Sequence, residues 1–590
     1  MQTIKGFNLV KREIDKKIYL KHICAKENKI IAEMLAARNV SPEDKNNFLD
    51  PKLRNILPTM NKMKDVDIAV KRIIKSIENN EKICIFGDYD VDGSTSTAMW
   101  LLFFEKLGIK PSYYIPNRIT EGYGPNNEAI EKIAKNGTKL LISADCGITA
   151  FEQFEKASLL GIDAIIIDHH QSSDILPKCI ACVNPNRFDE NDLKIEMKHL
   201  CACGVSFFVI IAINTELRKK NKDIELLQFT PLVAFATICD VMKLTSLNRA
   251  FIKTGLSTIQ AGKTFNLTKL IDISNKEKIQ RNNKITQKNI TAYSFGFLLG
   301  PMINAGGRIG NSSLGTELMI EKNEQNAENI AKKLFSLNEE RKEIESATLH
   351  NLIEQKDYIL KQIKELGYIM LYSKEWHEGV IGLIASRVKD KYFYPVFIGS
   401  ETKDRTIKFS SRSVDGVNIG EIIIQACEKK LLVAGGGHKL AGGLTCEIDK
   451  IDKLKQFLKD KIKVNADNSF ANKTLKYDVA LSLSGLTFEI LEKISKFEPF
   501  GQGNAKPIFL IQDVLVDYAD IIKDKHILLS ISDSESSEKA ICFNSVDTEL
   551  GKFLFSAKGK MITILASVEL EEYQGYKRKN IKIEDAILNN

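Results

Sequence analysis

Three aspartates stand at alternate positions after a short apolar run and before a glycine. They are Asp88, Asp90 and Asp92 in the segment ICIFGDYDVDG. Carboxylates at this spacing repel one another unless a cation lies among them, so the segment predicts a metal site. Acidic surface turns and EF-hand calcium loops share the pattern. An EF-hand is excluded because its last ligand, a bidentate glutamate, would fall at Met99.

The residues after the aspartates predict a helix. Ser94 or Thr95 is suited to cap a helix that runs through TSTAMWLLFFEKLG. The carboxylates would then lie between the carboxyl end of a strand and the amino end of a helix. Ligands bind at this edge of open α/β sheets, and helix amino termini favour phosphate groups.

Two further apolar segments are expected to form strands that end in polar side chains. LLISAD ends in Asp145, and DAIIIDHH ends in Asp168, His169 and His170. A single aspartate after a strand is more often a helix cap, and a single histidine is more often structural. Three parallel strands, however, place such residues side by side, and Asp240 after LVAFATIC adds a carboxylate. Mixed Asp and His ligands suit Mn²⁺ better than Ca²⁺, and Mg²⁺ also fits where oxygen ligands dominate.

Four motifs in this order, DYDVDG, SADCG, DHH and CDV, resemble those of the DHH phosphoesterase superfamily. Further segments are similar to the RecJ family, the bacterial single-strand-specific DNA exonucleases of that superfamily. These segments are NRITEGYG, GPMINAGGR, WHEGVIGLIASR, SSRS, GGGHKLAGG and PFGQGNAKP. The resemblance extends from about Glu33 to the carboxyl terminus.

The resemblance implies a hydrolase, a metal-dependent 5′-to-3′ exonuclease that releases mononucleotides from single-stranded DNA in DNA repair and recombination. The expected cofactors are two divalent ions, Mn²⁺ or Mg²⁺, about 3.5 to 4 Å apart, one activating water and the other stabilising the leaving oxygen. The expected metal ligands are Asp88, Asp90, Asp92, Asp145, His169 and Asp240. Asp145 is the expected bridge between the ions, while Asp88 and His170 are expected to bind a metal or orient its ligands.

Other side chains are expected to act on the substrate. The expected catalytic residues are Asp145, His169, His170 and Arg308, of which Arg308 would offset charge that develops at phosphorus. Arg118, Ser411 and Arg412 are expected near the terminal phosphate. The expected DNA-binding residues are Arg118, Asn304, Arg308, Ser411, Arg412, Gly437, His438, Tyr576, Lys577 and Arg578. Arginines in such loops can instead cap helices or brace a domain.

Two other functions fit part of the pattern. A DHH-type phosphoesterase of short oligonucleotides or small nucleotides would share every ligand, but would have little use for a barrel at the carboxyl terminus. A non-catalytic nucleic-acid scaffold would be expected to have lost ligands, and all are present here. The expected partner is single-stranded DNA, with a helicase and a single-strand-binding protein as further candidates.

The composition is typical of a large globular protein. With 590 residues, 44% of them hydrophobic, the chain is expected to form three or four domains. A net charge of +8, from 84 basic and 76 acidic residues, does not by itself indicate nucleic-acid binding. The first residues lack the apolar core of a secretory signal, and the longest apolar runs fall short of the roughly 20 residues that span a bilayer. We therefore expect a cytoplasmic protein without membrane association.

The 11 cysteines are odd in number and scattered, which favours reduced thiols over a disulfide framework. Cys179, Cys182, Cys201 and Cys203, with His199 nearby, have spacings that suit a structural zinc. The resemblance does not call for zinc, and these cysteines fall on an expected strand and at a helix entrance. Buried thiols are therefore the favoured interpretation.

The expected fold is α/β, with a parallel-sheet DHH catalytic domain, a long connecting helix, a smaller α/β DHH-associated domain and an all-β barrel of OB type. The expected boundaries are 1–60 for an amino-terminal helical extension, 61–316 for the catalytic domain, 317–366 for the connecting helix, 367–464 for the DHH-associated substrate domain and 465–590 for the single-strand-binding barrel. Between Thr316 and Leu366 there is neither Gly nor Pro, so one long helix is expected.

The carboxyl-terminal part contains five short alternating runs, which predict the barrel. They cover residues 508–518, 526–532, 540–543, 561–570 and 577–584. Tyr576, Lys577 and Arg578 offer base stacking and positive charge in one hairpin, although the same residues would suit a solvated edge strand. Earlier in the chain, GGGH at 435–438 predicts either a tight turn or a close approach of backbone to ligand.

Overall fold

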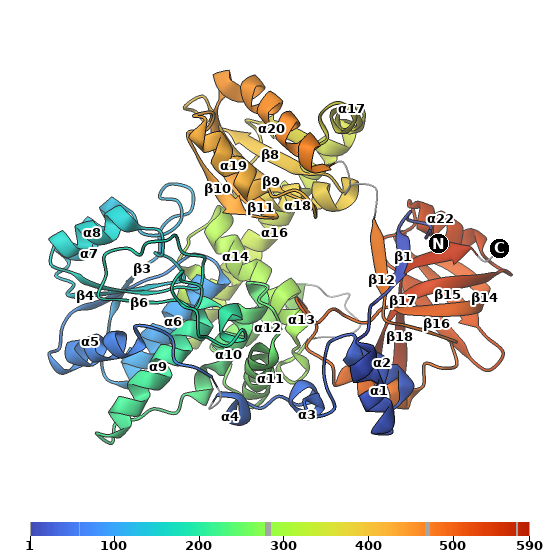
Figure 1. The fold of residues 1–590 in the computed structure, drawn as a ribbon, viewed down its shortest axis with the longest axis horizontal. Coiled ribbons are helices and arrows are strands. Elements are labelled where there is room, and N and C mark those ends of the chain that lie inside the picture. The colour runs from blue at the N-terminus through green and yellow to red at the C-terminus, as the bar shows by residue number, and fades with distance from the viewer. Residues whose placement is uncertain (1, 58–59, 278–284, 467–472, 574–575, 589–590) are drawn as a thin grey trace. The chain divides into compact units, whose positions relative to one another are not determined.

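The computed structural model describes residues 2–57, 60–277, 285–466, 473–573 and 576–588. The chain divides into two compact units. The larger comprises residues 61–240 and 255–471, and the smaller comprises residues 1–60, 241–254 and 472–590. The larger unit holds two sheets and the smaller holds the carboxyl-terminal barrel (Figure 1).

The first sheet of the larger unit is fully parallel, as predicted. Its spatial order is β3 (Ser112–Tyr114), β2 (Ile83–Phe86), β4 (Leu140–Ala144), β5 (Asp163–Ile167) and β6 (Ala181–Val183). Strands β2, β4 and β6 are buried throughout, which a parallel sheet requires because helices cover both of its faces. The motifs that follow β2, β4 and β5 therefore meet at one edge.

Helices cover both faces of this sheet (Figure 1). On one face, α7 (Asn127–Lys135) and α8 (Phe151–Leu159) share a hydrophobic core with the strands. On the other lie α5 (Val66–Glu78), α6 (Val91–Lys106) and α9 (Ala202–Arg218). Helix α6 is buried along nearly its whole length, with Trp100 donating a hydrogen bond to the Ser206 hydroxyl of α9 at 3.1 Å. The motif at the start of α6 is thus held by a rigid element.

A series of helices follows the sheet in sequence. It consists of α10 (Thr230–Cys239), α11 (Ser246–Gln260), α12 (Leu267–Glu277), α13 (Ala292–Ser294), a π-helical turn (Phe295–Leu299), α14 (Gly300–Ile309), α15 (Leu314–Ile320), α16 (Glu324–Glu354) and α17 (Lys356–Leu366). The connecting helix is α16, but the prediction of one helix over 316–366 is wrong. The Glu321 carboxylate accepts from the backbone N–H groups of Lys322 and Asn323, and the Asn323 side chain caps α16. A second break separates α16 from α17 at Gln355.

The second sheet of the larger unit is mixed and has the order β10-β11-β9-β8-β7. Its strands are β7 (Ile369–Ser373), β8 (Val396–Glu401), β9 (Thr406–Arg412), β10 (Ala434–His438) and β11 (Ala441–Glu447), with helices α18 (Ile381–Tyr392), α19 (Ile419–Glu428) and α20 (Ile451–Ala466). The GGGH segment lies in strand β10, paired with β11, so the tight-turn interpretation of these residues is wrong.

The smaller unit contains a closed five-stranded barrel, as predicted. Strands β14 (Phe509–Ile522), β15 (His526–Ser532), β16 (Ser537–Cys542), β18 (Tyr576–Leu588) and β17 (Met561–Tyr573) pair in this order, and β17 pairs with β14 to close the ring. Strand β13 (Val479–Leu481) joins β14, and α21 (Phe488–Ser495) and α22 (Glu549–Ser556) complete the domain.

The amino-terminal residues pack with this barrel. They form β1 (Asn8–Lys11), α1 (Lys16–Cys24), α2 (Lys29–Ala36), α3 (Lys45–Leu49) and α4 (Leu53–Ile56). Strand β1 pairs with β12 (Thr474–Tyr477), and apolar side chains of α2 belong to the same hydrophobic core as the barrel strands.

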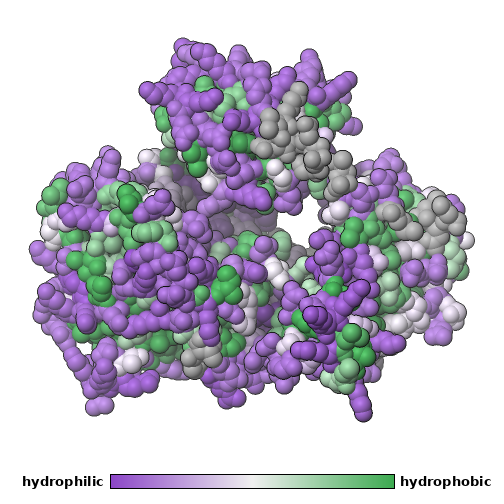
Figure 2. All heavy atoms as spheres, viewed as in Figure 1, coloured by the Kyte–Doolittle hydropathy of each residue, from purple (hydrophilic) through white to green (hydrophobic). Residues whose placement is uncertain are grey.

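The surface of the protein is mainly hydrophilic on the face that is drawn. On the face drawn in Figure 2, hydrophilic residues predominate and hydrophobic residues form small scattered groups. Within the described ranges, every helix is too short or too polar to cross a membrane.

Candidate metal centre

The aspartates after β2 surround the first turn of α6. The Asp90 carboxylate accepts from the Gly93 N–H at 3.0 Å and is the N-cap of this helix, so the prediction of Ser94 or Thr95 as the cap is wrong. Asp92 lies one residue inside the helix and is buried. Gly93 is required here because a Cβ atom at this position would lie 2.5 Å from the Asp88 carbonyl oxygen.

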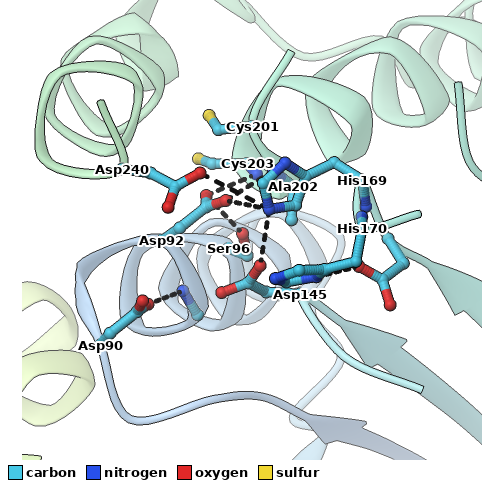
Figure 3. A network of polar contacts seen from close by, with 12 residues as sticks. Asp90, Asp92, Ser96, Asp145, His169, His170, Cys201, Ala202, Cys203 and Asp240 are labelled. Carbon is cyan, nitrogen blue, oxygen red and sulfur yellow. Dashed lines mark hydrogen bonds and ion pairs between the residues drawn. The ribbon is translucent and has the colours of Figure 1, made fainter. Parts of the chain in front are cut away.

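Asp92 is held in place by a second helix. The backbone N–H groups of Ala202 and Cys203, at the start of α9, donate to its carboxylate at 2.6 and 2.9 Å (Figure 3). Burial, and then repulsion from Asp90, raise the pKa of Asp92 to about 7 in spite of these donors. Its position therefore costs free energy unless a cation neutralises the charge.

Asp145 follows β4 with a left-handed backbone, φ +67°. Aspartate tolerates this region better than most residues because its side chain is short and polar. The side chain is buried, and burial followed by repulsion from Asp92, Asp90 and Asp240 raises the pKa of Asp145 well above its usual range. Burial and repulsion likewise raise the pKa values of Asp88 and Asp240.

Asp168 orients the two histidines that follow it. Its Oδ1 lies 2.7 Å from His170 Nδ1 and accepts from the backbone N–H groups of His169 and His170, while Oδ2 accepts from Ile148 N–H at 3.1 Å. Burial alone would raise the pKa of Asp168, but the hydrogen bond and charge of His170 hold it at about 2. The same pairing outweighs burial at His170 and raises its pKa to about 9.

His169 lies at the centre of the cluster. Its Nε2 is 3.4 Å from Asp145 Oδ1, 3.5 Å from Asp240 Oδ2 and 3.8 Å from Asp92 Oδ2. Figure 3 shows the ring directed toward all three carboxylates. Burial, and then the charge of His170, lower the pKa of His169 to about 4, so the ring is neutral at neutral pH. A neutral imidazole is the form that binds a metal.

The donor atoms form three overlapping groups that could each hold a metal ion. The groups are Asp88, Asp90 and Asp145; Asp92, His169 and Asp240; and Asp145, His169 and His170, with the atoms of each within 4.8 Å of one another. Four buried atoms of these groups that could bind a metal lack a hydrogen-bond partner in the described structure. They are Asp88 Oδ1, Asp145 Oδ1, His169 Nε2 and Asp240 Oδ2. Convergent orphaned oxygen and imidazole donors fit Mn²⁺ or Mg²⁺.

Three arginines lie close enough to one another to interact electrostatically. Arg308 is partly exposed and donates to the Gly379 carbonyl at 3.1 Å, and desolvation followed by the charges of Arg118, Arg341 and Arg412 lowers its pKa to about 10. Arg118 lies over the Tyr89 ring, 5.0 Å from its centroid. Arg412 donates to the hydroxyls of Ser386 and Ser410 and to the Ser411 carbonyl. Arg118, Arg308 and Arg412 thus form a positively charged group that can hold an anion.

The remaining expected DNA-binding residues have varied environments. Ser411 is buried, and its hydroxyl donates to the Gly442 carbonyl at 2.9 Å, so it braces the β9–β11 pair. Gly437 and His438 are exposed on β10, and the His438 charge contributes to the lowered pKa of His169. The side-chain oxygen of Asn304 on α14 is buried without a partner in the described structure.

Tyr576, Lys577 and Arg578 lie on β18 of the smaller unit. Tyr576 is 76% exposed, and Lys577 forms an ion pair with Glu492 of α21. The hairpin of β17 and β18 therefore presents aromatic and positively charged side chains to solvent.

Several functional side chains were missed in the sequence. The sequence predicts that Asp168 follows a strand but indicates no role for it, although its carboxylate binds both histidines. Tyr123 donates from its hydroxyl to the Asp145 carbonyl at 2.8 Å, and only its place in NRITEGYG pointed to the site. The amides of Ala202 and Cys203 have no sequence signal, because any residue supplies an N–H group.

The cysteines that were considered as zinc ligands lie mostly in the protein interior. Cys201 and Cys203 are buried at the start of α9, and Cys182 is buried on β6. Burial raises the pKa of each of these thiols. In the part of the chain that the structure describes, the groups able to hold a metal consist of Asp and His alone.

Comparison with known proteins is consistent with these observations. Residues 82–237 match the DHH family N-terminal domain, residues 364–464 the DHHA1 domain and residues 477–585 the RecJ OB domain. The chain is 31% identical over 473 residues to the single-stranded-DNA-specific exonuclease RecJ of Salmonella typhimurium, which covers 78% of this chain and 80% of that protein. The chain belongs to the RecJ family.

Other RecJ proteins are similar over most of this chain. The RecJ of Escherichia coli is 30% identical over 492 residues, 81% of this chain and 82% of its own length. The crystal structure of RecJ in complex with Mn²⁺ from Thermus thermophilus aligns with a TM-score of 0.80 at 22% identity, over 99% of this chain and 80% of that chain. The structural similarity shows that this chain has the RecJ fold.

Proposed function

We propose that this member of the RecJ family is a metal-dependent exonuclease that hydrolyses single-stranded DNA from the 5′ end to mononucleotides, in DNA repair and recombination. The observation that carries the proposal is a set of orphaned, buried donor atoms: those of Asp88, Asp145 and His169, which follow parallel strands, and that of Asp240, which ends helix α10. The RecJ proteins of Salmonella typhimurium and Escherichia coli are single-stranded-DNA-specific exonucleases.

Asp88, Asp90, Asp92, Asp145, His169 and Asp240 would hold two divalent ions, Mn²⁺ or Mg²⁺, with Asp145 as the shared ligand. Such ions, when bound, lower the pKa of water and neutralise the charge of the scissile phosphate. Asp168 keeps His170 in one orientation, and the α9 amides keep Asp92 in place. Tyr123 keeps the backbone at Asp145 in place through its hydrogen bond to the Asp145 carbonyl. These contacts pre-organise the ligands, which is the main contribution of the protein to a metal site.

The three arginines would bind phosphate groups of the substrate. Arg308 would stabilise the negative charge that grows on the phosphate oxygens, because its guanidinium is already oriented by the Gly379 carbonyl. Arg118 and Arg412 would bind the terminal 5′ phosphate, which would place the first internucleotide bond at the metal centre. Ser411 would act indirectly, because its hydroxyl is engaged by β11.

The barrel would bind the strand away from the site of cleavage. OB domains combine a basic groove with aromatic stacking, and Tyr576, Lys577 and Arg578 provide both features on β18. A helicase and a single-strand-binding protein as further partners, and a cytoplasmic location, stay predictions from the sequence.

The test is a time course on a long single strand with a 5′ phosphate and a label near that end, with a matched blunt duplex, in Mn²⁺, Mg²⁺ and chelator. Labelled mononucleotides should appear first, from the single strand alone and only with metal. Turnover of dinucleotides without release from the long strand would instead indicate a phosphoesterase of short oligonucleotides. Release from the 3′ end first would contradict the proposed polarity.

A further inference from the structure

Two exposed aromatic rings stack on each other just before α14. Tyr293 of α13 and Phe297 of the π-helical turn have ring centroids 4.7 Å apart and planes inclined by 23°. They are 69% and 72% exposed, respectively. Large aromatic side chains are usually buried, so a stacked pair exposed to solvent indicates a surface that binds a ligand. The π-helical turn itself is a rare element that is common at functional sites.

Phe297, one member of this pair, lines a groove in the larger unit. The groove has a volume of about 910 Å³ and is lined by α14, α16 and α18, which are labelled in Figure 1. Phe297 lines this groove, and so does Arg308 of the positively charged group beside the metal centre. Arg308 lies eleven positions after Phe297, a length of about 16 Å at the usual helical rise. The groove is therefore continuous with the phosphate-binding side chains.

The charge of the groove suits a polyanion. Its lining contains the cations Arg308, Arg341, Lys342 and Arg387 and the anions Glu345 and Asp390. Glu345 pairs with Arg341 at 2.8 Å and with Arg387 at 2.9 Å, so one carboxylate is shared by two guanidinium groups. Within the described residues Arg308 forms no ion pair with a carboxylate, and its guanidinium donates to the Gly379 carbonyl. The excess of positive charge favours phosphates over an apolar peptide.

We propose that Tyr293 and Phe297 form a stacking platform for a base of single-stranded DNA whose 5′ end lies at the metal centre. The proposal rests on the proposed exonuclease function and adds a binding site to it. A stacked strand advances about 3.4 Å per nucleotide, so about 16 Å corresponds to roughly five nucleotides, and to fewer in an extended strand. The platform would thus bind a base a few nucleotides behind the scissile bond, whatever its identity, because every base has a π-face.

The binding test uses a fluorescent base. 5′-phosphorylated oligonucleotides carrying 2-aminopurine at single positions from the second to the seventh are titrated with the full chain in chelator, so that no hydrolysis occurs. Stacking quenches 2-aminopurine, and we expect position-dependent quenching that is lost in Phe297→Ala and retained in Phe297→Trp. Tyr358→Ala, which removes a 51% exposed ring from α17, is the matched control and should leave the quenching as in the wild type. Identical profiles for Phe297→Ala and the wild type would overturn the proposal.

The kinetic test uses substrate length. Stacking on aromatic side chains contributes enough for truncation to weaken binding by about 5- to 150-fold per base. The double variant Tyr293→Ala with Phe297→Ala should therefore reduce the ratio of kcat/KM on a long strand to kcat/KM on a dinucleotide by about this factor, mainly through KM. Equal losses on both substrates would overturn the proposal, because they would indicate damage to the site itself. A wild-type chain that releases no mononucleotides from single strands would instead refute the proposed function, independently of the variants.

Discussion

Replacing Asp145 by asparagine is expected to stabilise the metal-free protein while abolishing hydrolysis. Asp145 Oδ1 is buried without a hydrogen-bond partner in the described structure, and burial and neighbouring carboxylates raise the pKa of this residue. An unsatisfied buried polar group costs about 1 to 3 kcal/mol, and more when charged. Asparagine removes the charge, keeps the shape and tolerates the left-handed backbone at φ +67°. We therefore expect the free energy of unfolding without metal to rise by about 1 to 3 kcal/mol.

The effect should depend on pH with a definite sign. A carboxyl group whose pKa is raised on folding binds protons more tightly in the folded state, so stability falls as pH rises above its ordinary pKa of about 4. The advantage of Asp145→Asn over the wild type in chelator should be small near pH 4 and should grow toward pH 8. Mn²⁺ should reverse the order, because a ligand at a hundred times its Kd stabilises the protein that binds it by about 2.7 kcal/mol.

Thermal unfolding in chelator and in Mn²⁺ measures the stability of the metal-free and metal-bound proteins. Exonuclease assays measure the loss of hydrolysis. A change of 1 kcal/mol corresponds to about 2 to 4 °C in Tm for a domain of 150–250 residues, so the expected shift is several degrees. Asp192→Asn changes an exposed aspartate in the same part of the chain and should alter neither Tm nor turnover. A lower Tm for Asp145→Asn in chelator would refute the electrostatic argument, and retained turnover would remove Asp145 from the shared-ligand role.

Substitutions at the start of α6 and in the smaller unit have distinct expected effects. Gly93→Ala should lower Mn²⁺ affinity at least about tenfold in calorimetric titration, since its Cβ would lie 2.5 Å from the Asp88 carbonyl oxygen; unchanged affinity would mean that the loop can shift. Arg249→Met should destabilise the smaller unit by about 3 kcal/mol or more in denaturant unfolding, because four carbonyl groups lose a buried donor. The Asp533 carboxylate accepts from backbone amides that hold its pKa well below the usual range, so Asp533→Asn should destabilise the barrel at pH 7, and the difference should shrink as pH falls below about 4. A pH-independent difference would assign the effect of Asp533 to shape alone.

The sequence predicted the parallel sheet and the cluster of donors because both depend on local patterns. Apolar runs that end in Asp or His place those residues at one sheet edge once the strands are parallel, and Asp88, Asp145 and His169 meet there. The helix cap was predicted wrongly because Ser94 and Asp90 are both good caps, and only the backbone path decides between them.

Features that depend on distant residues could not be predicted. The break between α15 and α16 contains neither Gly nor Pro, and the Glu321 side chain creates it by binding backbone amides. The packing of α2 against the barrel joins residues more than four hundred positions apart, for which a single sequence holds no pattern. The orientation of Asp92 by the amides of Ala202 and Cys203 likewise depends on residues far apart in the sequence.

The buried Arg249 indicates a structural role for the motif PFGQGNAKP, whose residues suggest no catalytic role. PFGQGNAKP supplied no metal ligand and no phosphate contact, yet the carbonyl of its first residue, Pro499, and those of the two residues before it bind a guanidinium group that has no acidic partner in the described ion pairs. Arg249 donates to the carbonyls of Phe497, Glu498, Pro499 and Phe48, and its charge lies 4.2 Å from the centroid of the Phe48 ring. Burial lowers the pKa of Arg249 to about 10, which still leaves it charged at neutral pH.

This arrangement ties the segment after Asp240 to the barrel domain. Leu244 N–H donates to the Gln502 carbonyl at 2.7 Å, and within the segment the Asn248 side chain donates to the Lys243 carbonyl, so residues 243–249 are bonded both to the motif and to one another. Val241, directly after Asp240, has φ +55°, an uncommon conformation for a β-branched residue that persists only when its surroundings enforce it. Because the strain begins one residue from a candidate metal ligand, the motif is best explained as an anchor for that segment.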